Sequence, residues 1–329
     1  MTRGAAFKRA TGAADIEHMV ERAVQVGYLE AVEPLPAPLE RRTGGLRALV
    51  RAARPHQWTK NLLLFAGILF AAKLGDLARW VDAVSVFAAY CAASSAAYLV
   101  NDVRDRELDA AHPLKRFRPI ASGELSPRSA LVAAGVLAAV ALALGALVSP
   151  LSLLLLVAFA GMQAAYSLAV KHVVLLDVFA IAGLFVTRAA AGAIAVDVRL
   201  SPWLVLCTGL LALFLALAKR RGELVQTGGT ESAGRPVLAG YSLALVDQLV
   251  SIAAASAICS YSIYTFTATD SPAMMATIPF VVFGLFRYLF LVQQRSLGEE
   301  PERVLITDVP ILATIACWGI AAAAILAFV

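Results

Sequence analysis

Long apolar runs separated by short polar segments fill the chain from residue 61 to its end. Nine of these runs are predicted as helices, because each approaches the thickness of a bilayer core and carries few charges. The runs cover residues 61–75, 80–100, 129–148, 151–170, 173–197, 202–218, 242–266, 273–293 and 309–328. The pattern predicts an all-α, polytopic membrane protein with nine transmembrane helices, of which the first is short.

The first fifty residues have a different pattern. They contain no apolar core of the length that a secretory signal requires. Residues 16–31 repeat apolar positions at helical spacing, and Pro34, Pro36 and Pro38 end that pattern. We divide the chain into a cytoplasmic N-terminal extension, residues 1–47, and a transmembrane catalytic domain, residues 48–329. An amphipathic surface helix and a poorly ordered tail are both open for the extension.

Composition and charge agree with a membrane protein. Of the 329 residues, 60% are hydrophobic, and the mean hydropathy of +0.76 is rare in a soluble domain. Loops predicted on one side of the membrane hold nineteen Lys and Arg residues, and the loops on the other side hold three. This bias predicts a cytoplasmic N-terminus, an inner-membrane location and polar loops that face the cytosol.

Residues 101–119, NDVRDRELDAAHPLKRFRP, crowd acids and bases against the end of the second run. If that helix continues, Asn101, Asp105 and Asp109 share one face, and Asp102 flanks it. Clustered carboxylates repel one another unless a cation lies among them. Hard oxygen ligands of this kind suit Mg²⁺, which then binds the phosphates of a substrate. The alternative is a solvated acidic helix end that is paired with nearby arginines.

The order N-D-x-x-D-x-x-x-D after a second span resembles the first motif of the UbiA superfamily of intramembrane prenyltransferases. The resemblance implies nine helices around a central cavity and a magnesium ion held by Asn101, Asp102, Asp105 and Asp109. The three aspartates are also the expected catalytic carboxylates.

Two further stretches match that family. The basic stretch KRFRPIASG follows the acidic motif and contributes Lys115, Arg116 and Arg118. The stretch YSLAVK, after the fourth span, approximates the family's Tyr-x-x-x-Lys pattern with one extra residue, through Tyr166 and Lys171. The resemblance implies catalytic roles for Lys115 and Arg116 and substrate contacts for the other three.

The second acidic motif of the family is replaced in this chain. After the sixth span the sequence reads LAKRRGEL, with Lys219, Arg220 and the single acid Glu223, all three assigned to substrate binding. Bases in place of an aspartate pair indicate a phosphate monoester that is bound directly by charge-assisted hydrogen bonds.

One branch of the superfamily fits this change, the decaprenyl-phosphate phosphoribosyltransferases. The stretches RPHQWTKN, AKRRGEL and GEEPE resemble it together with the acidic motif, from about residue 48 to the end of the chain. The resemblance implies transfer of 5-phosphoribose from phosphoribosyl pyrophosphate (PRPP) to a polyprenyl phosphate, which supplies a lipid-linked pentose for an envelope polysaccharide.

The chemistry of PRPP agrees with the two unlike motifs. Its diphosphate calls for a metal–carboxylate cluster, and its monophosphate calls for a basic cluster. Lys115 and Arg116 would share the charge of the leaving pyrophosphate with magnesium, or hold the monophosphate with Lys219 and Arg220. This division of roles stays open.

Arg188 lies well inside the fifth predicted span, in LFVTRAAAGA. An arginine at that depth is costly and normally faces a cavity or a partner, so we assign it to substrate binding. The alternative is a structural ion pair, and Asp177 lies about three turns away on the same face. Arg287 has the same two interpretations. By the resemblance, Lys60 and Asn61 lie at the mouth of the cavity.

Two other functions stay open. One is an aromatic polyprenyltransferase that uses a prenyl diphosphate, although the missing second acidic pair counts against it. The other is a non-catalytic lipid or metabolite transporter, although the carboxylates cluster on one side rather than at the midplane. The expected partners are PRPP, polyprenyl phosphate and the lipid bilayer, without nucleic acid, and a homo-oligomer is left open.

Overall fold

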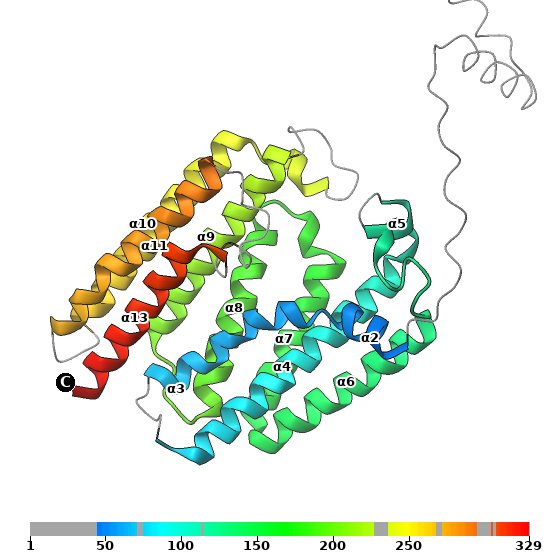
Figure 1. The fold of residues 1–329 in the computed structure, drawn as a ribbon, viewed down its shortest axis with the longest axis horizontal. Helices are drawn as coiled ribbons and strands as arrows, with labels where there is room; N and C mark the ends of the chain where they lie inside the picture. The colour runs from blue at the N-terminus through cyan, green and yellow to red at the C-terminus, as the bar shows by residue number, and fades with distance from the viewer. Residues whose placement is uncertain are drawn as a thin grey trace, which may run out of the picture. The chain divides into compact units, whose positions relative to one another are not determined.

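The computed structural model describes residues 45–70, 75–112, 115–226, 236–267, 272–294, 304 and 307–328. Within these residues every regular element is a helix, which confirms the all-α prediction. The chain separates into two units, residues 1–42 and 43–329. The first unit, with the helical pattern of residues 16–31, lies outside the described residues. The second unit is a bundle of helices (Figure 1).

Among the described residues, seven helices are long and apolar enough to cross a membrane. They are α4 (Leu77–Arg104), α6 (Pro127–Val148), α7 (Pro150–Leu168), α8 (Leu176–Ala195), α9 (Pro202–Gln226), α10 (Leu243–Thr267) and α11 (Ile278–Gln294) with the preceding η6 (Pro272–Thr277). Helix α13 (Val309–Phe328) is apolar over a shorter described stretch. The smaller elements are α2 (Gly45–Ala53), α5 (Arg106–Ala111), η3 (Lys115–Phe117), η4 (Val170–His172) and η5 (Pro236–Gly240).

The first predicted span is a different kind of element. As far as residue 70, it is formed by the 3₁₀ helix η2 (Pro55–Phe65) and the five-residue helix α3 (Ala66–Phe70). A 3₁₀ helix of eleven residues is uncommon, because its hydrogen-bond geometry is poorer than that of an α-helix. The seven spans above account for the predictions between residues 80 and 293, and the total of nine transmembrane helices stays a prediction.

Local sequence sets where several helices begin. The Asp76 carboxylate accepts hydrogen bonds from the backbone N–H groups of the first turn of α4. Ser126 and Ser149 cap α6 and α7 in the same way, and each is followed by a proline at the first helical position. Side-chain caps and N-terminal prolines satisfy or remove the N–H groups that a helix leaves without a partner. A few local residues therefore set the N-terminal ends of these helices.

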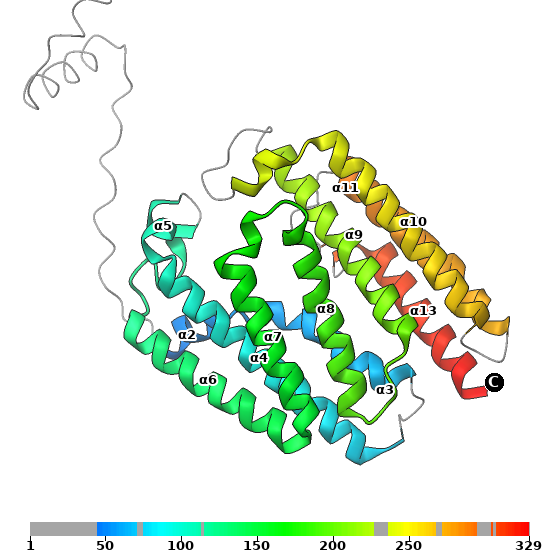
Figure 2. The same cartoon turned by 180° about the vertical axis from the view of Figure 1, so that it is seen from behind.

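Helix α8 lies between two groups of helices. Figures 1 and 2 both show α4, α6 and α7 on one side of it and α9, α10, α11 and α13 on the other. One core packs Phe214 of α9 against Tyr288 of α11, with ring centroids 5.4 Å apart. A second core packs Tyr90 of α4 against Phe159 of α7, with centroids 4.8 Å apart. Because α8 contributes side chains to both cores, it connects the two groups.

Glycines let the first span touch α8 through its backbone. A Cβ atom at Gly192 would lie 2.0 Å from the carbonyl oxygen of Leu64, and one at Gly67 would lie 2.7 Å from the Cα atom of Ala193. No side chain fits at either position. Small residues allow such close packing between membrane helices, where dispersion contacts and not water exclusion hold the helices together. This contact holds η2 and α3 against α8.

We expect the substitution Gly192→Ala to destabilise the bundle by about 1–3 kcal/mol, because the added methyl group forces η2 away from α8. Thermal unfolding of the detergent-solubilised protein measures this change. Gly135→Ala is the matched control, because a Cβ atom at Gly135 of α6 meets no other atom within 4 Å. Equal unfolding temperatures for the two variants would contradict the close-packing argument.

Candidate active site

The acidic motif lies where α4 ends and α5 begins. Helix α4 ends at Arg104, and Asp105 joins it to α5. The backbone N–H of Asp105 donates to the carbonyl of Asn101 at 2.9 Å, and the N–H of Asp109 donates to the carbonyl of Asp105 at 2.8 Å. The i, i+4 path predicted from the sequence therefore continues across the junction. The Asn101 amide also donates to the Asp105 carboxylate at 3.2 Å.

Two arginines from other segments converge on the acids. Arg54, which precedes η2, donates through Nη2 to both carboxylate oxygens of Asp102, at 2.6 and 2.9 Å. Arg118, which follows η3, donates through Nη1 to Asp102 at 3.2 Å and to Asp109 at 2.6 Å. Asp102 is 2% exposed and Asp109 is 4% exposed. The acidic motif thus contributes a buried pair of carboxylates that two guanidinium groups neutralise.

The two carboxylates that come together, those of Asp102 and Asp109, are not those that the sequence placed on one helix face. The sequence placed Asp102 beside the face shared by the other three polar residues. In the structure, Asp102 and Asp109 both accept a hydrogen bond from Nη1 of Arg118. Residues seven positions apart lie on one face after two helical turns, which accounts for the pairing. Asp105 points elsewhere and pairs with Asn101 and with Nε of Arg104, at 3.3 Å.

Asp102 and Asp109 fit a divalent cation by their chemistry. Their carboxylate oxygens reach the same atom, Nη1 of Arg118, and such hard oxygens are the ligands that Mg²⁺ prefers. In the part of the chain that the structure describes, no three acidic, His or Cys side chains are grouped closely enough to hold one metal ion. The quartet that adds Asn101 and Asp105 stays a prediction.

The rest of the basic stretch lies nearer the surface. The backbone N–H of Lys115 donates to Nδ1 of His112 at 3.4 Å, and the Lys115 side chain is half-buried. The exposed Arg116 guanidinium lies over the Phe117 ring, 4.9 Å from its centroid. Arg118 is the member of this stretch that reaches the carboxylates.

The connection between α7 and α8 links the two charged motifs. The Arg104 guanidinium donates to the carbonyl of Ser167 at 3.2 Å, which ties the end of α4 to the end of α7. At the other end of this connection, the backbone N–H of Leu175 donates to the Tyr241 hydroxyl at 2.8 Å, and Tyr241 shares the Asp177 carboxylate with Arg220 of α9. Tyr166, one residue before Ser167, is half-buried near the end of α7. Lys171 follows in η4 with a half-buried side chain. The predicted Tyr166–Lys171 segment thus belongs to the connection that contacts the acidic motif through Ser167 and the network of the basic motif through Leu175.

The basic motif encloses a fully buried ion pair. Arg220 and Asp177 are both 0% exposed, and Nε of Arg220 donates to Asp177 at 2.7 Å. Arg220 also pairs with Glu223 through Nη1. The Tyr241 hydroxyl donates to Asp177 at 2.6 Å and accepts from the backbone N–H of Leu175 at 2.8 Å. Burial, reinforced by the hydrogen bond to Asp177, raises the pKa of Tyr241, which therefore remains a donor at neutral pH.

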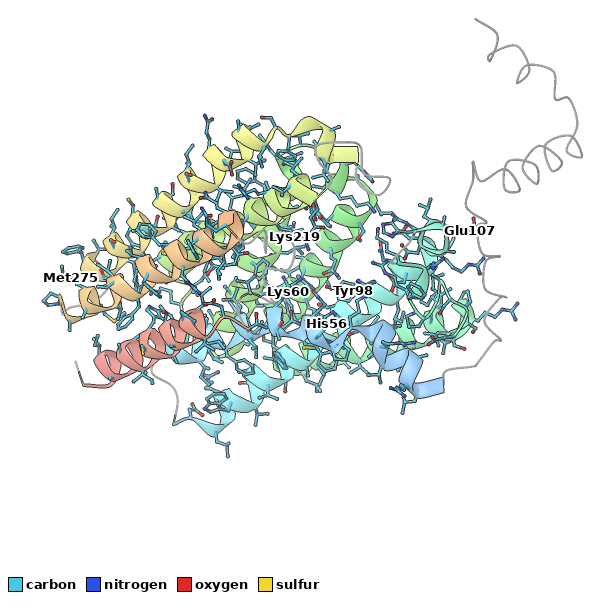
Figure 3. All side chains as sticks on the ribbon, turned by 45° about the horizontal axis from the view of Figure 1, so that its top comes forward. His56, Lys60, Tyr98, Glu107, Lys219 and Met275 are labelled. Atoms are coloured by element: carbon cyan, nitrogen blue, oxygen red, sulfur yellow. The ribbon has the colours of Figure 1, made fainter. Side chains whose placement is uncertain are left out.

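The three cations of the basic motif, at residues 219–221, differ in their contacts and burial. Arg221 is held by the Asp247 carboxylate at 2.6 Å and by the carbonyl of Val292 at 3.2 Å. Arg220 serves the buried network, although its Nη2 atom meets no hydrogen-bond partner among the described residues. Lys219 is half-buried. Figure 3 shows Lys219 in the central part of its view, as it does Lys60, whereas Glu107 lies toward one side.

Arg188 and Asn61 contact each other. Nε of Arg188 donates to the Asn61 side-chain oxygen at 2.8 Å, and Nη1 donates to the carbonyl of Leu184 at 3.0 Å. The guanidinium lies 4.6 Å from the centroid of the Phe159 ring. These contacts agree with a structural role that fixes η2 on α8, but the partner is not Asp177. A substrate contact for Arg188 or Asn61 stays a prediction.

Two other residues singled out from the sequence, Arg287 and Lys60, bond to side chains of the protein itself. Arg287 pairs with Asp308 at 2.9 Å, and Asp308 also caps the start of α13. Lys60 hydrogen-bonds with Gln57 one turn earlier. The first arrangement agrees with the structural interpretation of Arg287.

Sequence reasoning did not assign Arg54 to the site. The available signal was its position, because Arg54 precedes the first span on the same predicted side as the acidic motif. The Arg54 guanidinium also lies over the Tyr98 ring, 4.9 Å from its centroid.

The chain matches the model of the UbiA prenyltransferase family over residues 62–307. The chain belongs to the UbiA prenyltransferase family. Decaprenyl-phosphate phosphoribosyltransferase from Mycolicibacterium smegmatis is 32% identical over 295 residues, which are 85% of this chain and 91% of that protein. The enzyme of the same name from Corynebacterium glutamicum is 32% identical over 270 residues, 79% of this chain and 81% of that protein.

Solved structures share the fold of this UbiA family member. A UbiA homolog from Archaeoglobus fulgidus bound to GPP and Mg2+ superposes with a TM-score of 0.63 at 20% identity, covering 85% of this chain and 97% of that one. Family membership and the seven apolar helices make the protein a multi-pass membrane transferase. The transporter alternative is therefore not supported.

The buried network of the UbiA family member predicts a large effect of Asp177→Asn. Without the carboxylate, Arg220 loses its fully buried acidic partner and keeps the partly exposed Glu223. We therefore expect a loss of about 3 kcal/mol in unfolding free energy, the lower end for a broken buried pair. Denaturant unfolding in detergent measures it. Asp82→Asn is the control, since the more exposed Asp82 lies 3.8 Å from Arg79 and such pairs contribute about 0–1 kcal/mol. Equal losses for both variants would contradict this assignment.

Proposed function

We propose that this protein transfers 5-phosphoribose from PRPP to a polyprenyl phosphate and releases pyrophosphate in a magnesium-dependent reaction. The observation that carries the proposal is the pairing of an acidic motif at the end of α4 with a basic motif at the end of α9. Two contacts of the α7–α8 connection link these ends: Arg104 with Ser167, and Leu175 with Tyr241, which shares Asp177 with Arg220. Relatives named decaprenyl-phosphate phosphoribosyltransferase support the same donor and acceptor.

The acidic motif suits the diphosphate of PRPP. Asp102 and Asp109, with Asn101 and Asp105 beside them, would hold magnesium. The bound ion supplies positive charge that stabilises the leaving pyrophosphate. The Arg118 guanidinium, already among these acids, would bind phosphate oxygens through charge-assisted hydrogen bonds.

The basic motif suits the monophosphate at the other end of PRPP. Arg221 is held by Asp247, and Arg220 is largely engaged by Asp177 and Glu223. We assign the main contact to Lys219, the first base of the motif, with Nη2 of Arg220 as a second donor. Tyr166 and Lys171 border this end of the site from the α7–α8 connection, and Lys115 and Arg116 add positive charge from η3.

The transfer itself needs little covalent chemistry from the protein. An oxygen of the lipid phosphate forms a bond to the anomeric carbon, and the bond from that carbon to the pyrophosphate breaks with its electron pair. The acceptor phosphate is ionised at neutral pH, so no general base is required. Catalysis rests on positioning and electrostatic stabilisation. A single displacement inverts the configuration of the ribose.

The proposed location is the inner membrane, with the N-terminus and the site in the cytosol. The distribution of Lys and Arg in the sequence supports this orientation. A soluble phosphorylated sugar would then reach the site from the cytosol, and the lipid phosphate would reach it from the inner leaflet. The product is proposed as a lipid-linked pentose for an envelope polysaccharide.

A second function has one observation in its favour. The Archaeoglobus fulgidus structure of similar fold is bound to GPP and Mg2+, which agrees with an aromatic polyprenyltransferase that uses a prenyl diphosphate. The bases at residues 219–221 count against it, because they stand where a second acidic motif is expected in that class.

The deciding experiment supplies detergent-purified protein with labelled PRPP and polyprenyl phosphate, or with labelled prenyl diphosphate and an aromatic acid. We expect label from PRPP to enter the organic phase with Mg²⁺ and not with EDTA, since the diphosphate needs the metal. Transfer of the prenyl label alone would favour the second function. Retained configuration at the ribose would contradict the single displacement.

Lys219→Ala separates donor binding from acceptor binding. We expect the KM for PRPP to rise roughly tenfold, because one charge-assisted hydrogen bond to the monophosphate is lost. The KM for polyprenyl phosphate should stay the same. Arg128→Ala, at an exposed arginine in the first turn of α6, is the control for loss of positive charge. An unchanged KM for PRPP in Lys219→Ala would remove Lys219 from the donor site.

A further inference from the structure

The Asp102–Asp109 pair is neutralised by the chain's own cations. Arg54 engages both oxygens of Asp102, and Arg118 bridges the two acids. The residues Asp102 and Asp109 are 2% and 4% exposed, and a buried charge without a partner is strongly unfavourable. A metal ion must therefore compete with two guanidinium groups for the same carboxylate oxygens.

The arginines are better placed to change partners than the acids. The carboxylates belong to the continuous path from α4 into α5, whereas Arg54 lies between α2 and η2 and Arg118 follows η3. The Arg54 side chain is 23% exposed and the Arg118 side chain is 29% exposed. A guanidinium binds the oxygens of a phosphate in the same two-pronged manner as those of a carboxylate.

Tyr98 gives Arg54 a support that does not depend on Asp102. The guanidinium lies 4.9 Å from the centroid of the Tyr98 ring, within the range of a cation–π contact. Arg54 can thus release the carboxylate and remain above the site. Its backbone has a left-handed conformation, with φ 54° and ψ 59°, which directs the chain from α2 into η2 beside the acids.

We propose that Arg54 and Arg118 exchange partners when the donor binds. In the free protein they hold Asp102 and Asp109, and in the loaded site they hold the diphosphate while the carboxylates turn to the metal. Free metal then binds weakly, and metal and diphosphate strengthen each other's binding, since such coupling is reciprocal. Arg54 thereby becomes a donor-binding residue. This inference rests on the proposed function for the identity of the donor, but not for the exchange.

The test uses two probes, Mn²⁺ alone and inorganic pyrophosphate with Mg²⁺. In Arg118→Gln, the acids lose a competitor, and we expect Mn²⁺ alone to bind roughly tenfold tighter, as followed by the electron paramagnetic resonance signal of free Mn²⁺. The same variant should bind magnesium pyrophosphate roughly tenfold more weakly, as measured by calorimetry. A merely structural role for Arg118 would weaken both or leave both unchanged.

Matched variants keep the result decisive. Like Arg118→Gln, Arg54→Gln should bind Mn²⁺ more tightly and magnesium pyrophosphate more weakly. This second variant provides the test if Arg118→Gln fails to fold. Arg79→Gln, at the other end of α4 and paired with Asp197, should change neither affinity. Unchanged or weaker Mn²⁺ binding in folded Arg54→Gln and Arg118→Gln would overturn the exchange. If wild-type protein binds magnesium pyrophosphate but not PRPP, the proposed donor fails and the exchange stands.

Discussion

Compensation of buried charge is the constraint on which the polar end of this bundle depends. Asp102, Asp109 and Asp177 are each nearly or fully removed from solvent, so each requires a cation or a strong donor nearby. Arg54 and Arg118 meet the first two from separate segments, and Arg220 meets the third. These pairings bring η2 and the turn after η3 to the end of α4, and they bring the start of α8 to the end of α9.

The two networks have different consequences for function. Around Asp177, both oxygens accept hydrogen bonds from buried groups of α9 and of the segment that leads into α10, which favours a fixed frame. Around Asp102, the cations are partly exposed and come from connecting segments. A fixed basic end and an acidic end that exchanges partners, as we propose, would suit a donor that carries two unlike phosphate groups.

The packing of the first span on α8 also depends on compensation of a buried charge, that of Arg188 inside α8. Arg188 is buried among apolar helices, and it is accommodated by the Asn61 side chain, the Leu184 carbonyl and the Phe159 ring. Close backbone contact at Gly192 holds η2 in the same place. An arginine inside a membrane span therefore need not face a substrate, since neutral acceptors and an aromatic face can satisfy its donors.

The sequence by itself determined the all-α class, the apolar spans between residues 80 and 293 and the segments that carry charge. These features depend on periodicity and on contacts within a few residues. Tertiary structure decided the partners. Arg54 meets Asp102 across 48 residues, and Asp177 meets Arg220 across 43 residues rather than the nearer Arg188. A helical pattern specifies which side chains share a face, but only the packing of helices decides which faces meet.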